Sequence, residues 1–497
     1  MFNRKFLTIV FISSIGFISS CKAGLLGADT PVNAQPAAPA EPIVVNGMRT
    51  SYADVVDKTS PAVVRIRAEI KETAPKQQGF EGNPLGGDDF FRQFQQRPPQ
   101  NQRPKIDVGL GSGVIVNSDG TILTNNHVVD GAEKITVMTN DNKTFTAKVI
   151  GTDKLSDLAV IRIEGEGLPS LPLGNSDTVR IGDMVLAIGN PLGIGQTVTA
   201  GIISAKGRKT GLSDGSFEDF LQTDAPINRG NSGGALVNLN GELIGINSQI
   251  LSPGGASGGN IGIGFSIPSN MAKSVMDQLL KDGKVHRGRL GIGLQDLSSD
   301  LAEALDMKNV SGIIIGSVLK GSAADKAGLK QGDIITAVNG EKIEDGNVLR
   351  NKVAGTAPGT EIKLTISRDG KEQEFTATLE ELNSDDLKKS PSGQGDDDGT
   401  KPQNQGGKLG VSLQPVTPQI AKQLDLESDS EGLVVTEIDP TGAAAEAGIA
   451  RGDVILQVNK KKVNTVEDVK SALEGVTDKV ALLVSRRGQT SYVLVRL

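Results

Sequence analysis

The sequence predicts a mainly β protein of several domains, and three observations support this prediction. The chain has 497 residues, which is too long for one compact core. Glycine is abundant, with 62 residues, as expected of many short strands joined by glycine-containing turns. In addition, the pattern at 327–335 recurs at 447–455, so the C-terminal half contains a repeat.

The first 20 residues have the features of a secretory signal. Two cations, Arg4 and Lys5, precede a short apolar stretch at 6–20. The only cysteine, Cys21, follows directly, and this junction resembles a bacterial lipoprotein signal, in which the cysteine becomes the lipidated N-terminus. The alternative is an unmodified cysteine beside an ordinary cleavage site. Residues 21–47 are rich in Ala and Pro and are predicted to form a tether.

A series of short apolar runs predicts a β-rich domain over residues 48–283. Gly, Asn or Asp usually separates the runs, which favours antiparallel barrels or a sandwich over βαβ units. The expected strands lie at 64–70, 113–116, 121–124, 135–138, 145–150, 158–163, 184–188, 197–203, 234–237, 243–247 and 263–267.

A helix is expected at the end of this domain, over 269–282. Ser269 is predicted to cap it, and Gly283 is predicted to end it. Its apolar face is formed by Met271, Val275, Met276, Leu279 and Leu280.

A long polar insertion at 71–107 interrupts the strand pattern. It surrounds three aromatic residues, Phe90, Phe91 and Phe94, which the polar loop cannot bury by itself. The insertion is therefore expected either to dock these rings on apolar surface near an active site or to be a disordered flap.

Two copies of one domain follow, at 287–382 and 408–497. The segment beginning Leu290-Gly291-Ile292 corresponds to the one beginning Leu409-Gly410-Val411. Between the copies, residues 383–407 are rich in Asp, Gly, Pro and Gln and are predicted to be an acidic, polar linker.

A glycine-flanked serine, Ser232, is the clearest sign of chemistry. It lies in the sequence Asn-Arg-Gly-Asn-Ser-Gly-Gly at 228–234. A nucleophilic serine needs an exposed hydroxyl and backbone N–H groups directed at the developing oxyanion, and flanking glycines permit the necessary tight turn. A plain glycine-rich turn is the alternative interpretation of the motif alone.

Two further residues complete a possible catalytic triad. His127 follows the strand expected at 121–124 and is the only histidine of the β-rich domain. Asp157 precedes the strand expected at 158–163, where a carboxylate could orient an imidazole or simply cap a turn. The order His, Asp, Ser is that of the chymotrypsin class.

These segments resemble the HtrA family of periplasmic, Do-type, trypsin-like serine proteases, from about residue 50 to the end of the chain. The resemblance implies a chymotrypsin-like domain of two six-stranded barrels, two PDZ domains and a homotrimer that could assemble into larger cages. It makes Ser232 the nucleophile, His127 the base and Asp157 its orienting group. It also places an oxyanion hole at the N–H groups of Gly230 and Ser232.

Three regulatory features are also implied by this resemblance. The insertion 71–107 corresponds to the family's regulatory loop, and 206–219 to a loop that senses the PDZ domain. Six residues would bind the terminal carboxylate of a peptide in the PDZ domains: Leu290, Gly291, Ile292, Leu409, Gly410 and Val411. Arg287 and Arg289 are expected either to assist them or to be solvated linker charges, and His286 is expected to belong to the linker.

Composition excludes several other functions. The formal net charge of −7 argues against nucleic-acid binding, while one Cys and two His argue against thiolate or multi-histidine metal sites. No phosphate-binding loop is present, so no cofactor is expected and proteolysis would be independent of ATP. The predicted function is degradation of misfolded or unfolded proteins in the periplasm or cell envelope, with a possible lipid anchor and chaperone-like holding activity. The alternative is a PDZ chaperone or scaffold with little proteolysis.

Overall fold

The computed structural model describes residues 44–45, 48–71, 106–190, 195–211, 217–228, 230–251, 259–307, 311–343, 345–383, 408–424, 431–486 and 488–497. The predicted signal peptide, Cys21, the tether, the 71–107 insertion with its Phe residues and the 383–407 linker lie wholly or almost wholly outside these residues. The chain up to Asp54 forms a unit of its own, in which β1 (Val44–Val45) pairs with β2 (Met48–Arg49).

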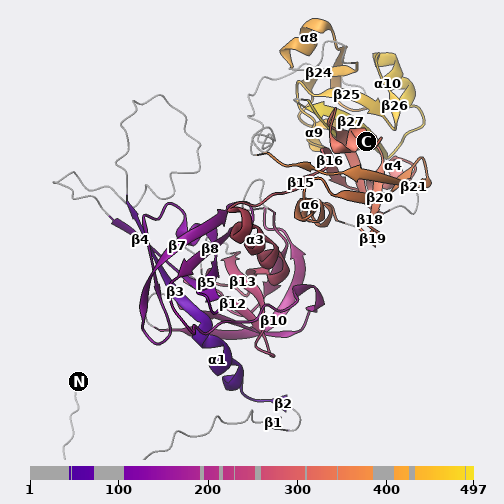
Figure 1. The fold of residues 1–497 in the computed structure, drawn as a ribbon. Coiled ribbons are helices and arrows are strands. Elements are labelled where there is room, and N and C mark those ends of the chain that lie inside the picture. The colour runs from indigo at the N-terminus through magenta and orange to yellow at the C-terminus, as the bar shows by residue number, and fades with distance from the viewer. Residues whose placement is uncertain are drawn as a thin grey trace, which may run out of the picture. The chain divides into compact units, whose positions relative to one another are not determined.

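Two closed six-stranded barrels confirm the predicted protease-type fold (Figure 1). The first closes in the order β3-β4-β5-β8-β7-β6 and the second in the order β10-β11-β14-β13-β12-β9. The first contains β3 (Val63–Lys71), β4 (Ile106–Ile115), β5 (Thr121–Thr124), β6 (Lys134–Met138), β7 (Thr144–Asp153) and β8 (Leu158–Ile163). The second contains β9 (Met184–Gly189), β10 (Thr197–Arg208), β11 (Phe220–Thr223), β12 (Ala235–Asn238), β13 (Leu243–Ile250) and β14 (Gly264–Pro268).

The alternating strand pattern is the physical basis of these barrels. Val64, Ile66 and Ala68 of β3 are fully buried, whereas the intervening Arg67 is exposed. One strand, β11, was not predicted from the sequence. Its pairing with β10 and β14 completes the second barrel.

Short helical segments connect these strands. They are α1 (Ala53–Thr59), the 3₁₀ turn η1 (Ser60–Ala62), α2 (Asn126–Val129), the 3₁₀ turn η2 (Ser176–Thr178) and α3 (Ser269–Asp282). Helix α3 buries Val275, Met276 and Leu279 and ends at Gly283 with φ of 70°, as predicted. The predicted cap is wrong: the chain enters the helix directly from β14, so Pro268 is the N-cap. The Ser269 hydroxyl is buried and donates to the Gly174 carbonyl (2.7 Å).

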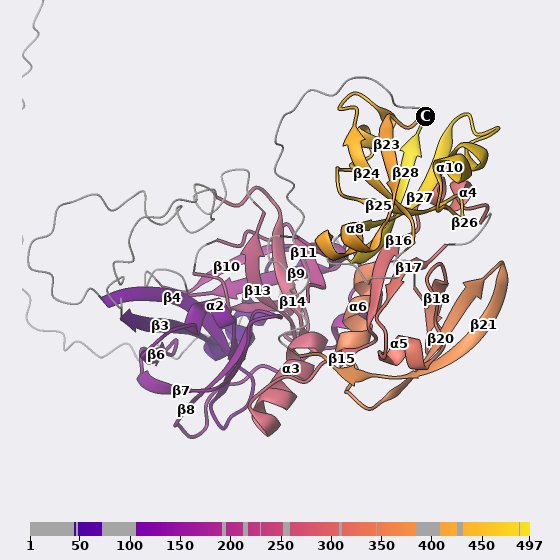
Figure 2. The same cartoon turned by 90° about the horizontal axis from the view of Figure 1, so that it is seen from above.

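The two repeats fold alike, with equivalent strand orders of β16-β17-β18-β20-β21 and β23-β24-β25-β27-β28 (Figure 2). The first contains β15 (Gly288–Arg289), β16 (Ile292–Asp296), α4 (Ser299–Ala304), β17 (Ile313–Val318), α5 (Ala323–Lys326), β18 (Ile334–Val338), β19 (Glu341–Lys342), α6 (Gly346–Gly355), β20 (Glu361–Arg368), β21 (Lys371–Thr378) and β22 (Glu380–Glu381). The second contains β23 (Val411–Pro415), α8 (Pro418–Gln423), β24 (Leu433–Ile438), α9 (Ala443–Glu446), β25 (Val454–Val458), β26 (Lys461–Lys462), α10 (Val466–Ala472), β27 (Lys479–Arg486) and β28 (Gln489–Arg496).

The same ion pair stabilises both repeats. Arg368 Nη2 lies 2.7 Å from the Asp333 carboxylate, and Arg486 Nη2 lies 2.6 Å from that of Asp453. Both aspartate side chains are only 2% exposed, so each carboxylate depends on its arginine for a compensating charge.

We predict that Arg368→Met lowers the free energy of unfolding of the first repeat by about 2 kcal/mol, because the Asp333 carboxylate stays buried without its guanidinium. Thermal unfolding of the full chain followed by calorimetry measures the effect. The control is Arg451→Met, which replaces an exposed arginine. Equal loss of stability in the two variants would contradict the prediction.

Candidate active site

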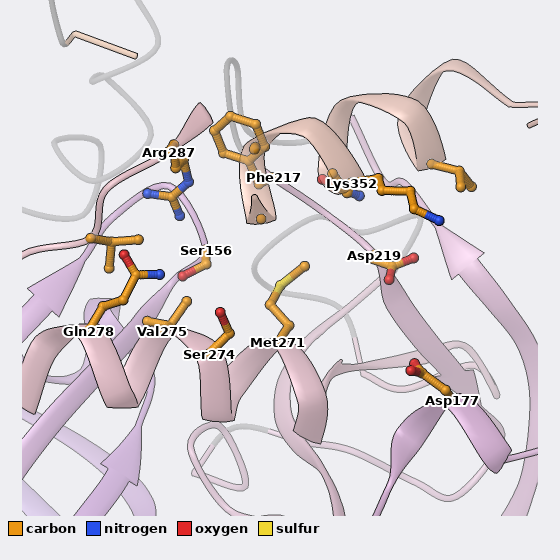
Figure 3. A pocket seen from close by; sticks show the side chains of 15 residues that line it. Ser156, Asp177, Phe217, Asp219, Met271, Ser274, Val275, Gln278, Arg287 and Lys352 are labelled. Atoms are coloured by element: carbon orange, nitrogen blue, oxygen red, sulfur yellow. The ribbon is translucent and has the colours of Figure 1, made fainter. Parts of the chain in front are cut away.

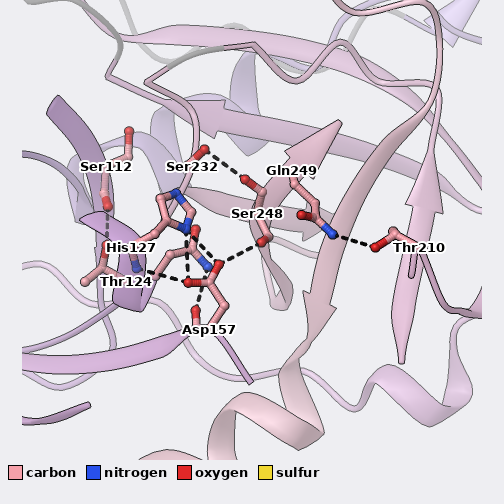
Figure 4. A network of polar contacts seen from close by, with 9 residues as sticks. Ser112, Thr124, His127, Asp157, Thr210, Ser232, Ser248 and Gln249 are labelled. Carbon is pink, nitrogen blue, oxygen red and sulfur yellow. Dashed lines mark hydrogen bonds and ion pairs between the residues drawn. The ribbon is translucent and has the colours of Figure 1, made fainter. Parts of the chain in front are cut away.

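The structure brings His127 and Asp157 into direct contact (Figure 4). His127 lies on α2, just after β5, and Asp157 lies in the turn that leads into β8. The His127 Nδ1 atom is 2.8 Å from Asp157 Oδ2 and 3.0 Å from Oδ1. The ring is half-exposed, so its other nitrogen is accessible to a substrate.

Several bonds fix the Asp157 carboxylate in this position. Its Oδ1 accepts the backbone N–H of His127 (3.0 Å), and its Oδ2 accepts the hydroxyl of Ser248 (3.1 Å). Asp157 has φ of 52°, an uncommon conformation for a non-glycine residue, and its carbonyl accepts the Asn126 N–H (3.1 Å). The carboxylate is therefore held by groups from both barrels.

Ser232 lies in the turn between β11 and β12, on the second barrel. Its hydroxyl donates to the Ser248 carbonyl (2.9 Å) and, among the residues that the structure describes, makes no hydrogen bond to His127 (Figure 4). The backbone N–H groups of Gly230 and Ser232 likewise donate to no other group among the described residues. Two free backbone donors beside a serine hydroxyl are the arrangement that an oxyanion hole requires.

Two glycines at this site, Gly233 and Gly189, leave no room for a side chain. Gly233 has φ of 81°, and a Cβ there would lie 2.1 Å from the Ser112 carbonyl oxygen. A Cβ on Gly189 would lie 2.5 Å from the Asn231 side chain, in the adjacent turn. Both positions exclude a side chain because two backbone segments approach closely there.

The sequence analysis missed two residues of this site, Ser248 and Ser112. Ser248 contacts both Asp157 and Ser232 from β13, and Ser112 of β4 bonds to the turn that carries Ser232. Neither lies near the triad residues in sequence. The Gly-Ser-Gly sequence at 111–113 was a usable signal for Ser112, because two glycines in a strand indicate close approach of another backbone.

The predicted carboxylate-binding loops have the same geometry in both repeats. Gly291 and Gly410 have φ of 79° and 72°. The carbonyls of the buried residues Leu290 and Leu409 accept the N–H groups of Ala324 in α5 and Ala444 in α9. Within the described chain, the N–H groups of Leu290, Gly291, Leu409 and Gly410 donate to no other group. Ile292 and Val411 begin the adjacent strands β16 and β23, so all six predicted residues occupy equivalent places.

Both expectations for Arg287 are wrong. Its side chain is 8% exposed and binds the Asp153 carboxylate through two nitrogens, at 2.9 and 2.5 Å. Asp153 also accepts the N–H and hydroxyl of Ser156, the residue before Asp157. Arg287 therefore stabilises the buried Asp153 carboxylate, which in turn holds Ser156 next to Asp157. His286, expected in the linker, pairs with Glu381 (2.7 Å).

The described end of the predicted sensor loop 206–219 contacts helix α6 of the first repeat; residues 212–216 lie outside the described chain. The Glu218 carbonyl accepts the side-chain amides of Asn347 (2.6 Å) and Asn351 (2.7 Å). The guanidinium carbons of Arg287 and Arg350 lie 4.8 and 4.6 Å from the centroid of the Phe217 ring. The backbone N–H of Phe217 donates to the Leu155 carbonyl. These contacts connect α6 to the segment that precedes Asp157.

A cavity of about 350 Å³ lies beside this contact (Figure 3). Its walls include α3, through Met271 and Val275, and α6, through Lys352. Burial raises the pKa of Asp219, which faces the cavity; the nearby Asp177 and Asp345 raise it further, and Lys206 opposes them.

The fold and this site define a chymotrypsin-like serine protease that carries two PDZ domains. Residues 111–246 match the trypsin-like peptidase domain family, and residues 288–379 and 400–485 each match the PDZ domain family.

Similar proteins identify the family. The chain is 42% identical over 457 residues to a "Probable periplasmic serine endoprotease DegP-like" of Chlamydia trachomatis, which covers 90% of this chain and 88% of the relative. It is 40% identical over 452 residues to the "Periplasmic pH-dependent serine endoprotease DegQ" of Escherichia coli, covering 90% and 91%. A solved structure titled "HtrA-type protease AlgW with tripeptide" is 39% identical and has a TM-score of 0.54, covering 68% of this chain and 99% of that one. The chain thus belongs to the HtrA family of DegP-type serine endoproteases.

The helices of the described residues reach at most 14 residues, the length of α3. None of them is both long enough and apolar enough to cross a bilayer.

We predict that Asp219→Asn raises the melting temperature at neutral pH. A raised pKa means that the native state binds more protons than the unfolded chain between pH 3.8 and the native pKa, so the parent loses stability as the pH rises through that window. The variant does not titrate, so its advantage should grow across the window and then stay constant.

Thermal melts of parent and variant from pH 3.5 upward measure this difference, with exposed Asp369→Asn as the control. A variant that is less stable than the parent at neutral pH would refute the prediction.

Proposed function

We propose that this chain is an ATP-independent serine endopeptidase that degrades misfolded or unfolded proteins in the cell envelope. The observation that carries the proposal is the contact of His127 with Asp157, next to a serine whose turn offers two free N–H donors. Ser232 is the nucleophile, His127 the general base and then acid, and Asp157 the group that orients the ring. Gly230 and Ser232 supply the oxyanion hole.

The geometry supports the following sequence of events. The Ser232 hydroxyl turns from the Ser248 carbonyl to the free ring nitrogen of His127, which takes its proton as the oxygen attacks the scissile carbonyl. The Asp157 carboxylate, fixed by Ser248 and by the His127 backbone, stabilises the imidazolium. The N–H groups of Gly230 and Ser232 bind the oxyanion. His127 then protonates the leaving amine, and water completes the hydrolysis by the reverse path.

Digestion of β-casein by the parent and by Ser232→Ala tests this assignment. We expect the variant to lose several orders of magnitude in rate, because no other group can form the acyl intermediate. The control is Ser269→Ala, which removes a buried serine hydroxyl at the start of helix α3 and should retain the parental rate. Parental activity in Ser232→Ala would refute the proposed nucleophile.

A holding activity is the second candidate function, and PDZ loops that bind chain ends would favour it. The same Ser232→Ala variant separates the two functions, since it should still suppress aggregation of an unfolded protein if holding is independent of cleavage. We also propose a homotrimer as the building block and the periplasm as the location, the latter supported by the names of the relatives. Lipidation of Cys21 remains a prediction that mass spectrometry of the mature N-terminus would test.

Regulation by peptides at the PDZ domains is part of the proposal. Two connections support it: the Asn347 and Asn351 amides bind the Glu218 carbonyl, and Arg287 binds Asp153. The second reaches a residue that precedes Asp157 directly. The first does so through Phe217, whose backbone N–H donates to the Leu155 carbonyl. A peptide that moves α6 would therefore alter the support of the catalytic carboxylate.

We predict that a peptide with an apolar C-terminal residue increases cleavage of a separate reporter, with a coupling of about 1–3 kcal/mol. The double variant Asn347→Ala, Asn351→Ala should bind the peptide but lose most of this response, because it no longer holds Glu218. Exposed Asn464→Ala in the second domain is the control. An unchanged response in the double variant would show that the coupling takes another route.

A further inference from the structure

Ser112 is a buried residue whose hydroxyl connects the first barrel to the turn carrying Ser232. Its Oγ donates to the Gly230 carbonyl (2.6 Å) and accepts the Asn190 N–H (2.8 Å). Its backbone N–H donates to the Ser232 carbonyl (2.8 Å), and its carbonyl accepts the Thr124 hydroxyl (2.7 Å; Figure 4). The residue is completely buried.

The neighbouring glycines explain how Ser112 reaches this position. A Cβ on Gly111 would lie 2.6 Å from Val128 Cγ1, and one on Gly113 would lie 2.7 Å from Ile122 Cγ2. Successive residues of a strand face opposite sides, so the two glycines bring β4 against the core of the first barrel. Ser112, between them, projects to the other side, where Gly230 and Asn190 lie.

The hydrogen bond from Ser112 restricts the backbone conformation of Gly230. Its φ of 95° is accessible to glycine at low cost, but glycine also adopts many other conformations. Rotation about its backbone would turn its N–H away from the oxyanion. The hydrogen bond from the Ser112 hydroxyl to the Gly230 carbonyl restricts that rotation. The same Ser112 hydroxyl accepts the Asn190 N–H, so it serves as both donor and acceptor.

We propose that Ser112 is a positioning residue for catalysis, whose hydroxyl holds Gly230 in the conformation that directs its N–H at the oxyanion. The inference rests on the proposed roles of Ser232 and Gly230. Ser112 touches no reacting atom, and it acts only through the turn. Its loss should therefore weaken the transition state more than the bound substrate.

The test compares the steady-state kinetics of a chromogenic peptide in the parent, Ser112→Ala and Ser112→Cys. Cysteine fills the space that alanine leaves empty but is only a weak hydrogen-bond donor, so it separates loss of the hydrogen bond from creation of a cavity. We expect kcat to fall about 10–100-fold, somewhat less than for loss of an entire oxyanion donor, with KM within about twofold of the parent. Affinity for a peptidyl boronic acid, whose tetrahedral adduct uses the oxyanion hole, should fall in parallel.

Ser269→Ala is the matched control, because it also removes a buried hydroxyl that donates to a backbone carbonyl. It should lose thermal stability as the Ser112 variants do, yet keep kcat and boronate affinity. If the folded Ser112 variants also keep both, or if only KM changes, Ser112 is a structural residue and the inference is wrong. Activity that persists in Ser232→Ala would instead refute the proposed function itself, so the two failures are distinguishable.

Discussion

The Asp157 carboxylate is the point at which the two barrels meet. One oxygen accepts the backbone N–H of His127 from the first barrel, and the other accepts the hydroxyl of Ser248 from the second. A buried or half-buried carboxylate must satisfy several lone pairs at once, and neither barrel provides enough donors alone. The bonds that orient the imidazole therefore also connect the two barrels.

A second set of bonds supports the serine turn from the opposite side. Ser112 of β4 binds the carbonyls of both Gly230 and Ser232. Gly233 and Gly189 allow the backbones to come close enough for these contacts, since a Cβ at either position would clash with its neighbour. The glycines of the motif thus serve the packing of the turn as well as access for a substrate.

The first PDZ domain is joined to this centre by contacts near the start of the Asp157 turn. Arg287 is buried with Asp153, and α6 holds the Glu218 carbonyl through two asparagine amides. Loss of one partner of a buried ion pair is costly, so Arg287 and Asp153 stabilise each other in this position. Contacts of the first PDZ domain thus reach the short segment from Asp153 to Asp157.

Local pattern was enough to predict most of the elements and the chemistry. Alternating apolar residues predicted the strands, the repeat predicted two equivalent domains, and Ser232, His127 and Asp157 were recognisable from their residue types, order and glycine neighbours. The signals failed where a residue's role depends on a distant partner. Strand β11 is recognised only by its pairing with β10 and β14. Ser269 loses its capping role because β14 leads directly into α3.

Arg287, Ser248 and Ser112 show what only the tertiary structure decided. Each is an ordinary polar residue in its local sequence, and each finds its partner more than ten positions away, across a barrel or between domains. The sequence by itself determined which groups perform the proposed chemistry. Folding decided which groups hold them, because burial leaves a polar atom only the partners that the packed chain brings to it.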